Sequence, residues 1–335
     1  MIIKAFPLIR PGVFAIDFRI LDSDSSKILI KPDFLSICAA DLRYYLGLRP
    51  GNVLNKKLPM VLIHEAIGTV VSSTNKDFEI GAKLILLPCG LNATIDSNYA
   101  PNAFFRSSNA DGFCQELVSL ETEEIIKISK QDDALPFVFS ELLSVSFQAI
   151  RQIKDEITSS NCIAIWGDGS LGYLLSLVLS EIYPEKDITV IGKHEDKLEK
   201  FTFVDHIETV FNRSNRCFDL MIECVGGNGS QNAIADMIAS ANPKATILLT
   251  GVSENPPAIN TRTILEKGLT LKGTTRSIRD DFINANMFLA DDTNRKRVSY
   301  LLSDLIDVHN ENELKTAFEK ARSSKFKTVI SFAPP

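Results

Sequence analysis

The chain has 335 residues, and its 36 Lys and Arg against 42 Asp and Glu give a formal net charge of −6. Hydrophobic residues make up 45% and charged residues 23%, which is ordinary for a globular protein. The length predicts two domains, and the lack of a basic excess argues against a nucleic-acid-binding protein.

Segments that would target or anchor the chain are not evident. No apolar run approaches the roughly 20 residues that a membrane-spanning helix needs. Residues 1–12 lack the apolar region of a signal peptide. Six cysteines are scattered without a regular spacing, so no disulfide framework is expected. These features predict a cytoplasmic protein with no membrane partner.

The first 135 residues are predicted to be rich in strands. Short β-prone runs are separated by turn residues at Lys27–Lys31, Gly68–Ser72, Lys83–Leu87 and Phe113–Leu120. A helical pattern is evident only at Cys38–Leu46. Residues 140–152 predict a helix that leads out of this strand-rich part.

Strands and helices alternate from residue 160 to residue 275. The predicted elements are a strand Cys162–Trp166, a helix from Leu171 to Ile182 stopped by Pro184, and strands at Ile188–Ile191, Asp219–Cys224, Ala245–Val252 and Leu269–Gly273, with a helix at Ser230–Ala241. Such alternation predicts a parallel sheet with right-handed crossovers. The tail predicts helices at Asp280–Leu289 and Glu311–Ala321 and a strand at Thr328–Phe332.

A glycine-rich turn joins the first of these strands to its helix. It reads Gly167-Asp168-Gly169-Ser170-Leu171-Gly172, which is the G-x-G-x-x-G pattern in the strand–turn–helix context that dinucleotide binding requires. The first glycine permits a tight turn, the second lets the backbone approach a pyrophosphate, and the third allows close helix–strand packing. A structural glycine-rich turn is the alternative interpretation.

The residues that follow the second strand of this unit help to predict whether the cofactor is NAD or NADP(H). NAD-binding units usually place Asp or Glu there to bind the ribose 2′-hydroxyl. This chain has Gly192-Lys193-His194 instead, so cations stand where the acid is expected. The substitution favours a 2′-phosphate and therefore NADP(H), although Glu195 and Asp196 follow closely.

The strand-rich part contains residues suited to a metal. Cys38, the pair His64-Glu65 and Glu141 offer sulfur, nitrogen and oxygen donors, which zinc accepts in tetrahedral geometry. No compact C-x-x-C or H-E-x-x-H motif is present. From spacing alone, a buried cysteine and an ordinary His-Glu pair remain the alternative interpretation.

The order of these motifs resembles the zinc-dependent medium-chain dehydrogenases/reductases over essentially the whole chain. The shared features are Cys38-x-x-Asp41, His64-Glu65 with Gly68, Glu141 before Ser144-Val145, the turn Gly167–Gly172, and Glu223-Cys224-Val225-Gly226. Residues 38–47, 56–60, 63–65, 105–113 and 167–171 are most similar to one branch, the ribulose-5-phosphate reductases (ribitol-5-phosphate dehydrogenases) of the CDP-ribitol pathway. This pathway supplies ribitol-containing polymers such as teichoic acid.

This resemblance implies an α/β architecture with two parts. A GroES-like, mainly β catalytic domain would cover residues 1–139 and be completed by a C-terminal return at residues 286–335. A Rossmann domain with a doubly wound parallel sheet would cover residues 140–285. The family also implies a homodimer.

The resemblance implies that Cys38, His64 and Glu141 are zinc ligands. Glu65 would be a fourth or exchangeable carboxylate, and Asp41 would orient His64 through its other ring nitrogen. The family often has glycine where Ile63 stands, and Ser or Thr where Ala40 stands, so the proton relay is not defined. Only Cys89 and Cys114 lie between residues 85 and 120, too few for a four-cysteine structural zinc.

The implied reaction is NADPH-linked reduction of D-ribulose 5-phosphate to D-ribitol 5-phosphate, with one catalytic zinc. Because the chain is acidic overall, the substrate phosphate needs local cations and hydroxyls. Candidates for this role are Arg43, Lys57, Arg106, Ser107 and Ser108, with Arg106 preferred. Thr275, which follows a predicted strand, is a candidate for contact with the cofactor.

Two other functions are compatible with the same motifs. One is a zinc polyol dehydrogenase that oxidises unphosphorylated sugar alcohols with NAD. Lys193, His194 and the segment around Arg106 argue against it. The other is a nucleotide-binding protein of dehydrogenase fold without turnover, against which the complete set of candidate ligands argues. Functional coupling to a ribitol-5-phosphate cytidylyltransferase is a further expectation from the pathway.

Overall fold

The structure is a computed structural model that describes residues 1–21, 24, 27–89, 97–100 and 103–334. It divides into two compact units, one formed by Met1–Ser144 with Ile278–Pro335 and the other by Val145–Ser277. Within the described ranges, no helix has both the length and the hydropathy needed to cross a membrane. Each unit is described by itself below.

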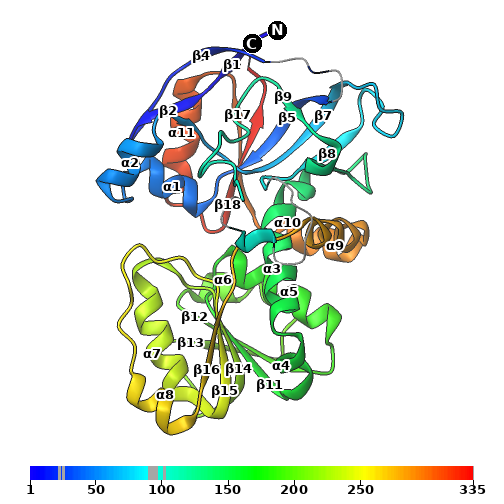
Figure 1. Cartoon of the computed structure of the whole chain (residues 1–335). Helices are drawn as coiled ribbons and strands as arrows, with labels where there is room; N and C mark the ends of the chain where they lie inside the picture. Colours follow the sequence, from blue (N-terminus) through cyan, green and yellow to red (C-terminus); the bar gives the residue numbers. More distant parts are fainter. Residues whose placement is uncertain (22–23, 25–26, 90–96, 101–102, 335) are drawn as a thin grey trace. The chain divides into compact units, whose positions relative to one another are not determined.

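A seven-stranded sheet forms the centre of the first unit, in the order β10-β8-β7-β5-β18-β17 with β9 paired to β5. Its strands are β5 (Ile28–Ser36), β7 (Glu65–Ser72), β8 (Lys83–Leu86), β9 (Val118–Leu120), β10 (Ile125–Lys127), β17 (Leu302–Val308) and β18 (Lys327–Phe332). Strand β18 pairs antiparallel with β5, with Ile330 opposite Leu35. The end of the chain therefore completes a sheet begun near its start (Figure 1).

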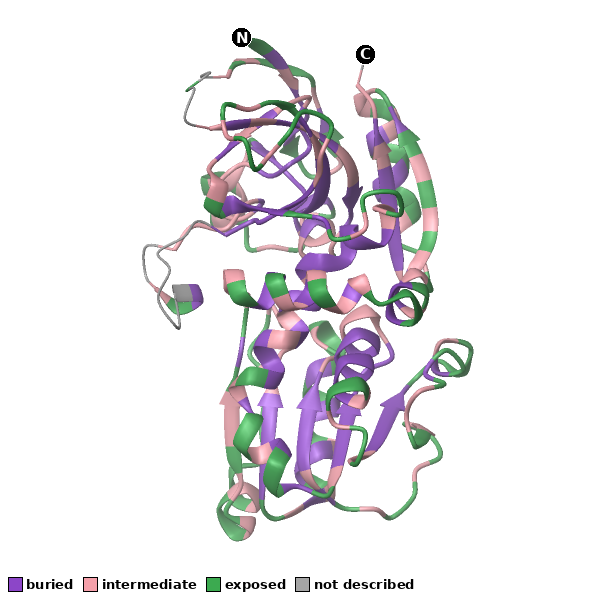
Figure 2. Ribbon diagram, turned by 90° about the vertical axis from the view of Figure 1, so that its right-hand side faces the viewer, coloured by how far each residue is buried: buried purple, intermediate pink, exposed green. Residues whose placement is uncertain are grey.

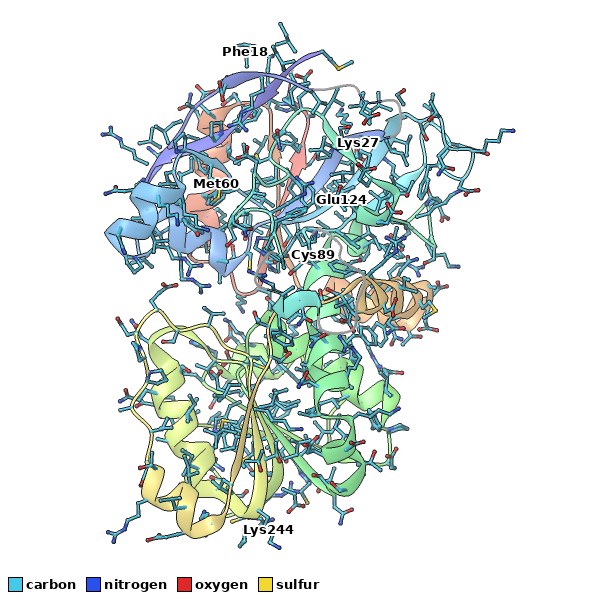
Figure 3. All side chains as sticks on the ribbon, viewed as in Figure 1. Phe18, Lys27, Met60, Cys89, Glu124 and Lys244 are labelled. Carbon is cyan, nitrogen blue, oxygen red and sulfur yellow. The ribbon has the colours of Figure 1, made fainter. Side chains whose placement is uncertain are left out.

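Two smaller sheets flank this one. One pairs β1 (Ile2–Ala5) with β4 (Asp17–Ile20), and the other joins β3 (Val13–Phe14), β2 (Pro7–Arg10) and β6 (Met60–Val61). The helices of this unit include α1 (Ala39–Tyr45), α2 (Gly51–Lys57), α9 (Arg279–Ala290), α10 (Asp292–Ser299) and α11 (Glu311–Ala321), with a 3₁₀ turn at Leu135–Phe139. Figure 3 shows Phe18 at the outer edge of the unit and Met60 inside it.

An aromatic cluster holds α1 against α11. The ring of Phe14 lies 5.7 Å from that of Tyr45 and 4.9 Å from that of Phe318, and the last two rings are 5.1 Å apart. All three side chains are buried, so they contribute both apolar burial and ring–ring attraction. Asn310 caps α11 by accepting from the backbone N–H groups of Asn312 and Glu313. This packing fixes the C-terminal end of α1, the helix that Cys38 precedes.

The second unit contains a six-stranded parallel sheet in the order β13-β12-β11-β14-β15-β16. Its strands are β11 (Cys162–Trp166), β12 (Asp187–Gly192), β13 (His206–Thr209), β14 (Phe218–Glu223), β15 (Ala241–Leu249) and β16 (Thr270–Gly273). The helices include α3 (Ser140–Gln152, which begins in the first unit), α4 (Lys154–Ser159), α5 (Ser170–Ile182), α6 (Glu195–Leu198), α7 (Ser230–Ser240) and α8 (Thr261–Lys267). In Figure 1, α7 and α8 cover one face of the sheet, and α4 and α5 lie on the other.

The central strands of this sheet are buried on both faces (Figure 2). Within β11, the side chains from Ile163 to Trp166 are all buried, and the inner part of β12 is buried as well. Parallel strands covered by helices on both faces read as continuous apolar runs rather than alternating ones. This explains why these strands are evident in the sequence as unbroken hydrophobic segments.

Along the chain, the boundaries between the two units lie at Ser144/Val145 and Ser277/Ile278. The predicted boundaries were at residues 139 and 285. The first boundary falls inside α3, because the first turn of that helix lies in the first unit together with the 3₁₀ segment Leu135–Phe139. The second falls before α9, whose Arg279 donates to the backbone oxygen of Ile125 and whose Asn286 accepts from Ser129. These contacts place α9 in the first unit.

Several strands differ from the predictions or were not predicted, and three of these differences have identifiable reasons. Strand β5 runs past Pro32 to Ser36, because a register shift there accommodates the missing N–H. The predicted strand at Phe113 begins only at Val118. The preceding backbone instead bonds to the 61–63 segment, with the Phe113 N–H 2.7 Å from the Ile63 oxygen. Strand β17 is not predicted at all, since Asp304 and Asp307 interrupt its apolar pattern.

Candidate active site and nucleotide site

Cys38 lies at the junction between β5 and α1. The strand ends at Ser36, and the Ile37 N–H donates to the backbone oxygen of Thr328 in β18. Helix α1 then begins, with the Cys38 N–H donating to Asp41 Oδ2 at 3.1 Å. This carboxylate in the first turn suits the positive end of the helix dipole. The thiol is therefore placed by a strand end on one side and by a helix start on the other.

His64 and Glu65 follow a strained turn between β6 and β7. Ile63 has a φ of +72°, which is rare for a β-branched residue and costs backbone energy. Gly112 packs against this turn so closely that an added Cβ would lie 2.3 Å from the Leu62 oxygen and 2.5 Å from the Ile63 oxygen. The Gly112 N–H donates to the Val61 oxygen at 2.8 Å. The glycine thus lets a second segment support the turn that carries His64.

The structure brings Cys38, His64 and Glu65 together. One donor atom from each lies within 4.8 Å of the others. His64 and Glu65 are buried, and the Glu65 Oε2 atom has no hydrogen-bond partner among the described residues. Glu141, in the first turn of α3, is also buried and interacts electrostatically with His64 and Glu65. Glu141 is not one of the three residues whose donor atoms lie within 4.8 Å of one another.

Asp41 is fully buried and connects the segments around this cluster. Its carboxylate accepts from the backbone N–H groups of Cys38 and Ile63, the latter at 3.0 Å, and from the Ser107 hydroxyl. His64 Nδ1 lies 3.7 Å from Asp41 Oδ1, which is an ion-pair distance but too long for a hydrogen bond. The predicted role of Asp41 in orienting His64 stays a prediction, whereas its hydrogen bonds anchor both flanking turns.

Burial and neighbouring charges shift several pKa values in the cluster. Burial raises the pKa of Glu141 to about 7, and the nearby Glu65 carboxylate adds to the rise. Burial by itself would lower the pKa of His64, yet the Asp41 and Cys38 groups raise it well above its usual value. The pKa of Asp41 stays low despite burial, because His64, Ser107 and the Ile63 N–H all favour its charged form.

The glycine-rich turn has the geometry that a pyrophosphate needs. Gly167 has a φ of +129°, and an added Cβ would lie 2.8 Å from the Cys224 carbonyl carbon. A Cβ on Gly172 would lie 2.0 Å from the Gly167 oxygen, so helix and turn are in direct contact. A Cβ on Gly169 would enter open space. Gly169 also caps the N-terminus of α5, where backbone N–H groups and the helix dipole favour an anion.

Asp168 fixes the end of the second strand. Its Oδ2 atom accepts from the backbone N–H groups of Lys193 and His194, each at 2.6 Å, and lies 3.0 Å from His194 Nδ1. Gly192 leaves room for this carboxylate, because a Cβ there would lie 2.7 Å from Asp168 Cβ. Lys193 and His194 are exposed, and their contact with the cofactor stays a prediction. Ser170 and Leu171 form the first turn of α5.

Comparison with known proteins identifies the family. Residues 24–130 match the family model described as Alcohol dehydrogenase GroES-like domain. Ribulose-5-phosphate reductase 1 of Staphylococcus aureus is 38% identical over 340 residues, and the match covers 99% of both chains. The crystal structure of S. aureus TarJ in complex with NADPH superposes with a TM-score of 0.88 at 36% identity, covering 99% of this chain and 100% of that one.

The chain belongs to the medium-chain dehydrogenase/reductase family. Ribulose-5-phosphate reductase of Bacillus spizizenii is a further relative, 35% identical with 99% of each chain covered. The chain is therefore an oxidoreductase, and the predicted fold class, a GroES-like part with a Rossmann part, is confirmed. At 21% identity, L-idonate 5-dehydrogenase of Escherichia coli shares the fold, with a TM-score of 0.84.

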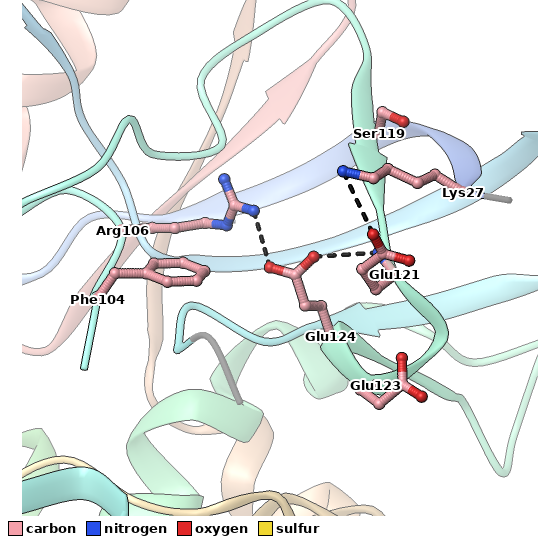
Figure 4. Close-up of a pocket in the computed structure, with 7 residues that line it drawn as sticks. All are labelled: Lys27, Phe104, Arg106, Ser119, Glu121, Glu123 and Glu124. Carbon is pink, nitrogen blue, oxygen red and sulfur yellow. Dashed lines mark hydrogen bonds and ion pairs between the residues drawn. The ribbon is translucent and has the colours of Figure 1, made fainter. Parts of the chain in front are cut away.

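The residues predicted to bind substrate phosphate in this medium-chain dehydrogenase have internal partners. Arg106 donates to Glu124 Oε1 at 3.0 Å, and its guanidinium lies over the rings of Phe104 and Phe113. Arg106 lies in the wall of a pocket of about 470 Å³ (Figure 4). The residues that line this pocket are Lys27, Phe104, Arg106, Ser119, Glu121, Glu123 and Glu124. Ser107 donates to Asp41, and Lys57 donates to the Ser108 oxygen. Their role toward a phosphate remains a prediction.

Two buried charged residues near the candidate sites were not predicted to have a role. Lys327, at the start of β18, donates to Glu65 Oε1 at 2.5 Å and to the Ile37 oxygen at 3.3 Å. Glu223, at the end of β14, accepts from the N–H groups of Gly226 at 2.7 Å and Gly251 at 2.9 Å. Glu223 was noted only as part of a motif, and no local signal marks Lys327 because its partner is 262 residues away.

Proposed function

We propose that this enzyme is a zinc-dependent, NADPH-linked reductase that converts D-ribulose 5-phosphate to D-ribitol 5-phosphate. The supporting observation is the match of essentially the whole chain to ribulose-5-phosphate reductases, combined with the cluster of a half-buried Cys38 and the buried His64 and Glu65. The product would supply CDP-ribitol synthesis for wall or capsule polymers in the cytoplasm. A homodimer and coupling to a cytidylyltransferase are part of the same proposal.

The donor atoms of the cluster fit zinc. A thiol, an imidazole and a carboxylate are the ligand types that zinc prefers, and the unpartnered Glu65 Oε2 is an atom that a cation would satisfy. Cys38, His64 and Glu141 would hold the ion, with Glu65 as a fourth or exchangeable ligand. When bound, zinc supplies a Lewis acid that polarises a carbonyl oxygen.

The other residues bind, position and supply protons. The turn Gly167–Gly172 and the start of α5 would hold the pyrophosphate, and Lys193 with His194 would contact the 2′-phosphate. Reduction moves a hydride from C4 of NADPH to C2 of the ketose and adds one proton to O2. Because Ala40 has no hydroxyl, Glu65 or water would provide that proton. Thr275 follows β16 and is proposed to contact the cofactor.

The direct test follows NADPH absorbance with purified protein of measured zinc content. NADPH should be consumed rapidly with D-ribulose 5-phosphate and far more slowly with D-ribulose. Parallel assays with NADH define the cofactor. Turnover of D-ribulose but not of its phosphate would support the polyol dehydrogenase instead. Zinc-loaded protein that turns over neither substrate would contradict the proposal.

Reversing the charge of Lys193 is expected to weaken NADPH binding selectively. In a Lys193→Glu variant the carboxylate would repel the 2′-phosphate, so the Kd for NADPH should rise at least about tenfold while that for NADH changes little. Trp166 is the only tryptophan in the chain and immediately precedes Gly167, so its fluorescence reports binding of either cofactor. Lys200→Glu is the charge-matched control, since Lys200 is exposed after α6. Equal weakening of NADH and NADPH would contradict the assignment.

Zinc uptake by metal-free protein is expected to weaken as the pH falls below about 7. The raised pKa values of Glu141 and His64 mean that both groups become mostly protonated in the folded, metal-free protein as the pH falls below about 7. Ligands must lose these protons, so protons and zinc compete. Titration calorimetry in two buffers of different ionisation enthalpy measures the protons released. The release should be smaller in Glu141→Gln, and no release at pH 6 would contradict the prediction.

A further inference from the structure

Lys327 is buried beside the candidate zinc ligands. Only 5% of its surface is exposed, although lysine is among the residues that are least often buried. Its ammonium group donates to Glu65 Oε1 and to the Ile37 backbone oxygen. It also interacts electrostatically with Cys38 and Glu141. A lysine with these neighbours faces the same cluster of anionic groups that would hold the metal.

The sheet fixes Lys327 and Glu65 in relation to each other. Strand β5 lies between β7 and β18, and Ser36 of β5 is paired with Glu65 on one side and with Val329 on the other. Lys327 stands two residues before Val329, and Cys38 stands two residues after Ser36. Three neighbouring strands therefore deliver a cation, a carboxylate and a thiol to one place, with little freedom for any of them to move away.

The two oxygens of Glu65 have different environments. Oε1 accepts the bond from Lys327 at 2.5 Å, whereas the buried Oε2 has no hydrogen-bond partner among the described residues. A charge-assisted bond of this kind is roughly twice as strong as a neutral one. Lys327 thus competes for the carboxylate with any cation that approaches Oε2, and its own positive charge repels that cation.

We propose that Lys327 is a positioning residue that keeps Glu65 an exchangeable ligand of the zinc ion rather than a permanent one. This inference rests on the zinc site proposed above. With Lys327 present, the thiolate of Cys38 and the carboxylates of Glu65 and Glu141 are balanced by zinc and the ammonium group. Without it, a buried carboxylate would lack a partner and would bind the metal firmly. Catalytic zinc sites keep one position open, and Lys327 preserves that position.

If Lys327 has this role, its loss should change the rate of zinc release in the direction opposite to that caused by damage to the fold. Loss of a residue that merely supports the fold would loosen the metal. Loss of Lys327 should instead make the metal leave more slowly, because Glu65 becomes a full ligand. The conservative Lys327→Arg keeps the positive charge and should behave like the natural protein.

The test measures zinc content and the rate of zinc release into excess chelator for the natural protein, Lys327→Met, Lys327→Arg and Glu65→Gln. Lys327→Met should release zinc about tenfold more slowly, a change of the size, but not of the direction, that is usual for residues that contact metal ligands. Lys327→Arg should release it at the natural rate. The double variant Lys327→Met/Glu65→Gln should regain the rate of Glu65→Gln. Lys320→Met, which removes an ion-paired but exposed lysine of α11, is the control.

The outcomes separate this inference from the proposed function. Natural protein without zinc would overturn the zinc site itself. If the natural protein contains zinc but Lys327→Met releases zinc faster than it does, only the proposed role of Lys327 is overturned. If Lys327→Met does not fold, Glu65→Gln decides alone. Release within about threefold of the natural rate supports an exchangeable Glu65, whereas release about tenfold faster or more shows a permanent ligand and overturns the inference.

Discussion

Replacing Cys38 with alanine is expected to lower kcat by at least about 10³-fold and to leave the protein without stoichiometric zinc. Cys38 supplies the only sulfur donor of the cluster, and alanine offers no atom that can replace it. The fold should persist, because the neighbouring aromatic packing of α1 against α11 does not involve the thiol. Zinc analysis, circular dichroism and the NADPH assay together measure these three properties.

The matched control for this variant is Cys217→Ala, which removes an exposed thiol of the second unit. It should keep both zinc and activity. Alanine at His64 should reproduce the loss seen with Cys38→Ala, since it removes the nitrogen donor of the same cluster. A Cys38→Ala protein that stays fully active after its metal has been removed would contradict the zinc mechanism.

Replacing Asp41 with alanine is expected to lower the free energy of unfolding by about 3–5 kcal/mol. The variant leaves the buried N–H groups of Cys38 and Ile63 and the Ser107 hydroxyl without their acceptor. It also removes the negative charge that lies 3.7 Å from His64 Nδ1. Zinc affinity should therefore fall about 10–100-fold in addition.

Denaturant unfolding of metal-free protein measures the first effect of Asp41→Ala, and chelator competition measures the second. Ser107→Ala loses one donor and leaves the acceptor in place, so its destabilisation should be clearly smaller. Asp77→Ala, at an exposed turn, should change stability by no more than about 0.5 kcal/mol. An Asp41→Ala protein as stable as the natural one would show that the carboxylate does not hold these segments together.

The central strands of the second unit and the glycine-rich turn could be predicted because their signals are local. The strand Cys162–Trp166, the turn Gly167–Gly172 and the helix after it are contiguous, and a few residues specify each through apolar periodicity and glycine geometry. Strand β17 was missed because Asp304 and Asp307 interrupt its apolar pattern. Its position depends on pairing with β18, which no local pattern reveals.

The candidate zinc ligands were identified by resemblance to a family, because the spacing of these residues alone was equally compatible with a buried cysteine and an ordinary His-Glu pair. Cys38 and His64 are far apart in sequence and stand on different elements, so only the folded sheet places them together. The same limit applies to Arg106. Its charge suggested a phosphate site, but the structure gives it an internal partner in Glu124 and two aromatic neighbours. A sequence cannot show which charges are already paired.

From the sequence we could predict the class of this protein, its two kinds of domain, the glycine-rich turn and the candidate zinc ligands. The turn follows from residue types at short, fixed spacings, whereas the domains and the candidate ligands came from resemblance to a family. Only the tertiary structure decided that Asp41 joins three segments, that Asp168 holds the end of β12, and that Lys327 pairs with Glu65 across 262 residues. The physical reason is that pairing in a sheet and burial depend on contacts between distant residues, and the energies of buried charges depend on which partner the fold supplies.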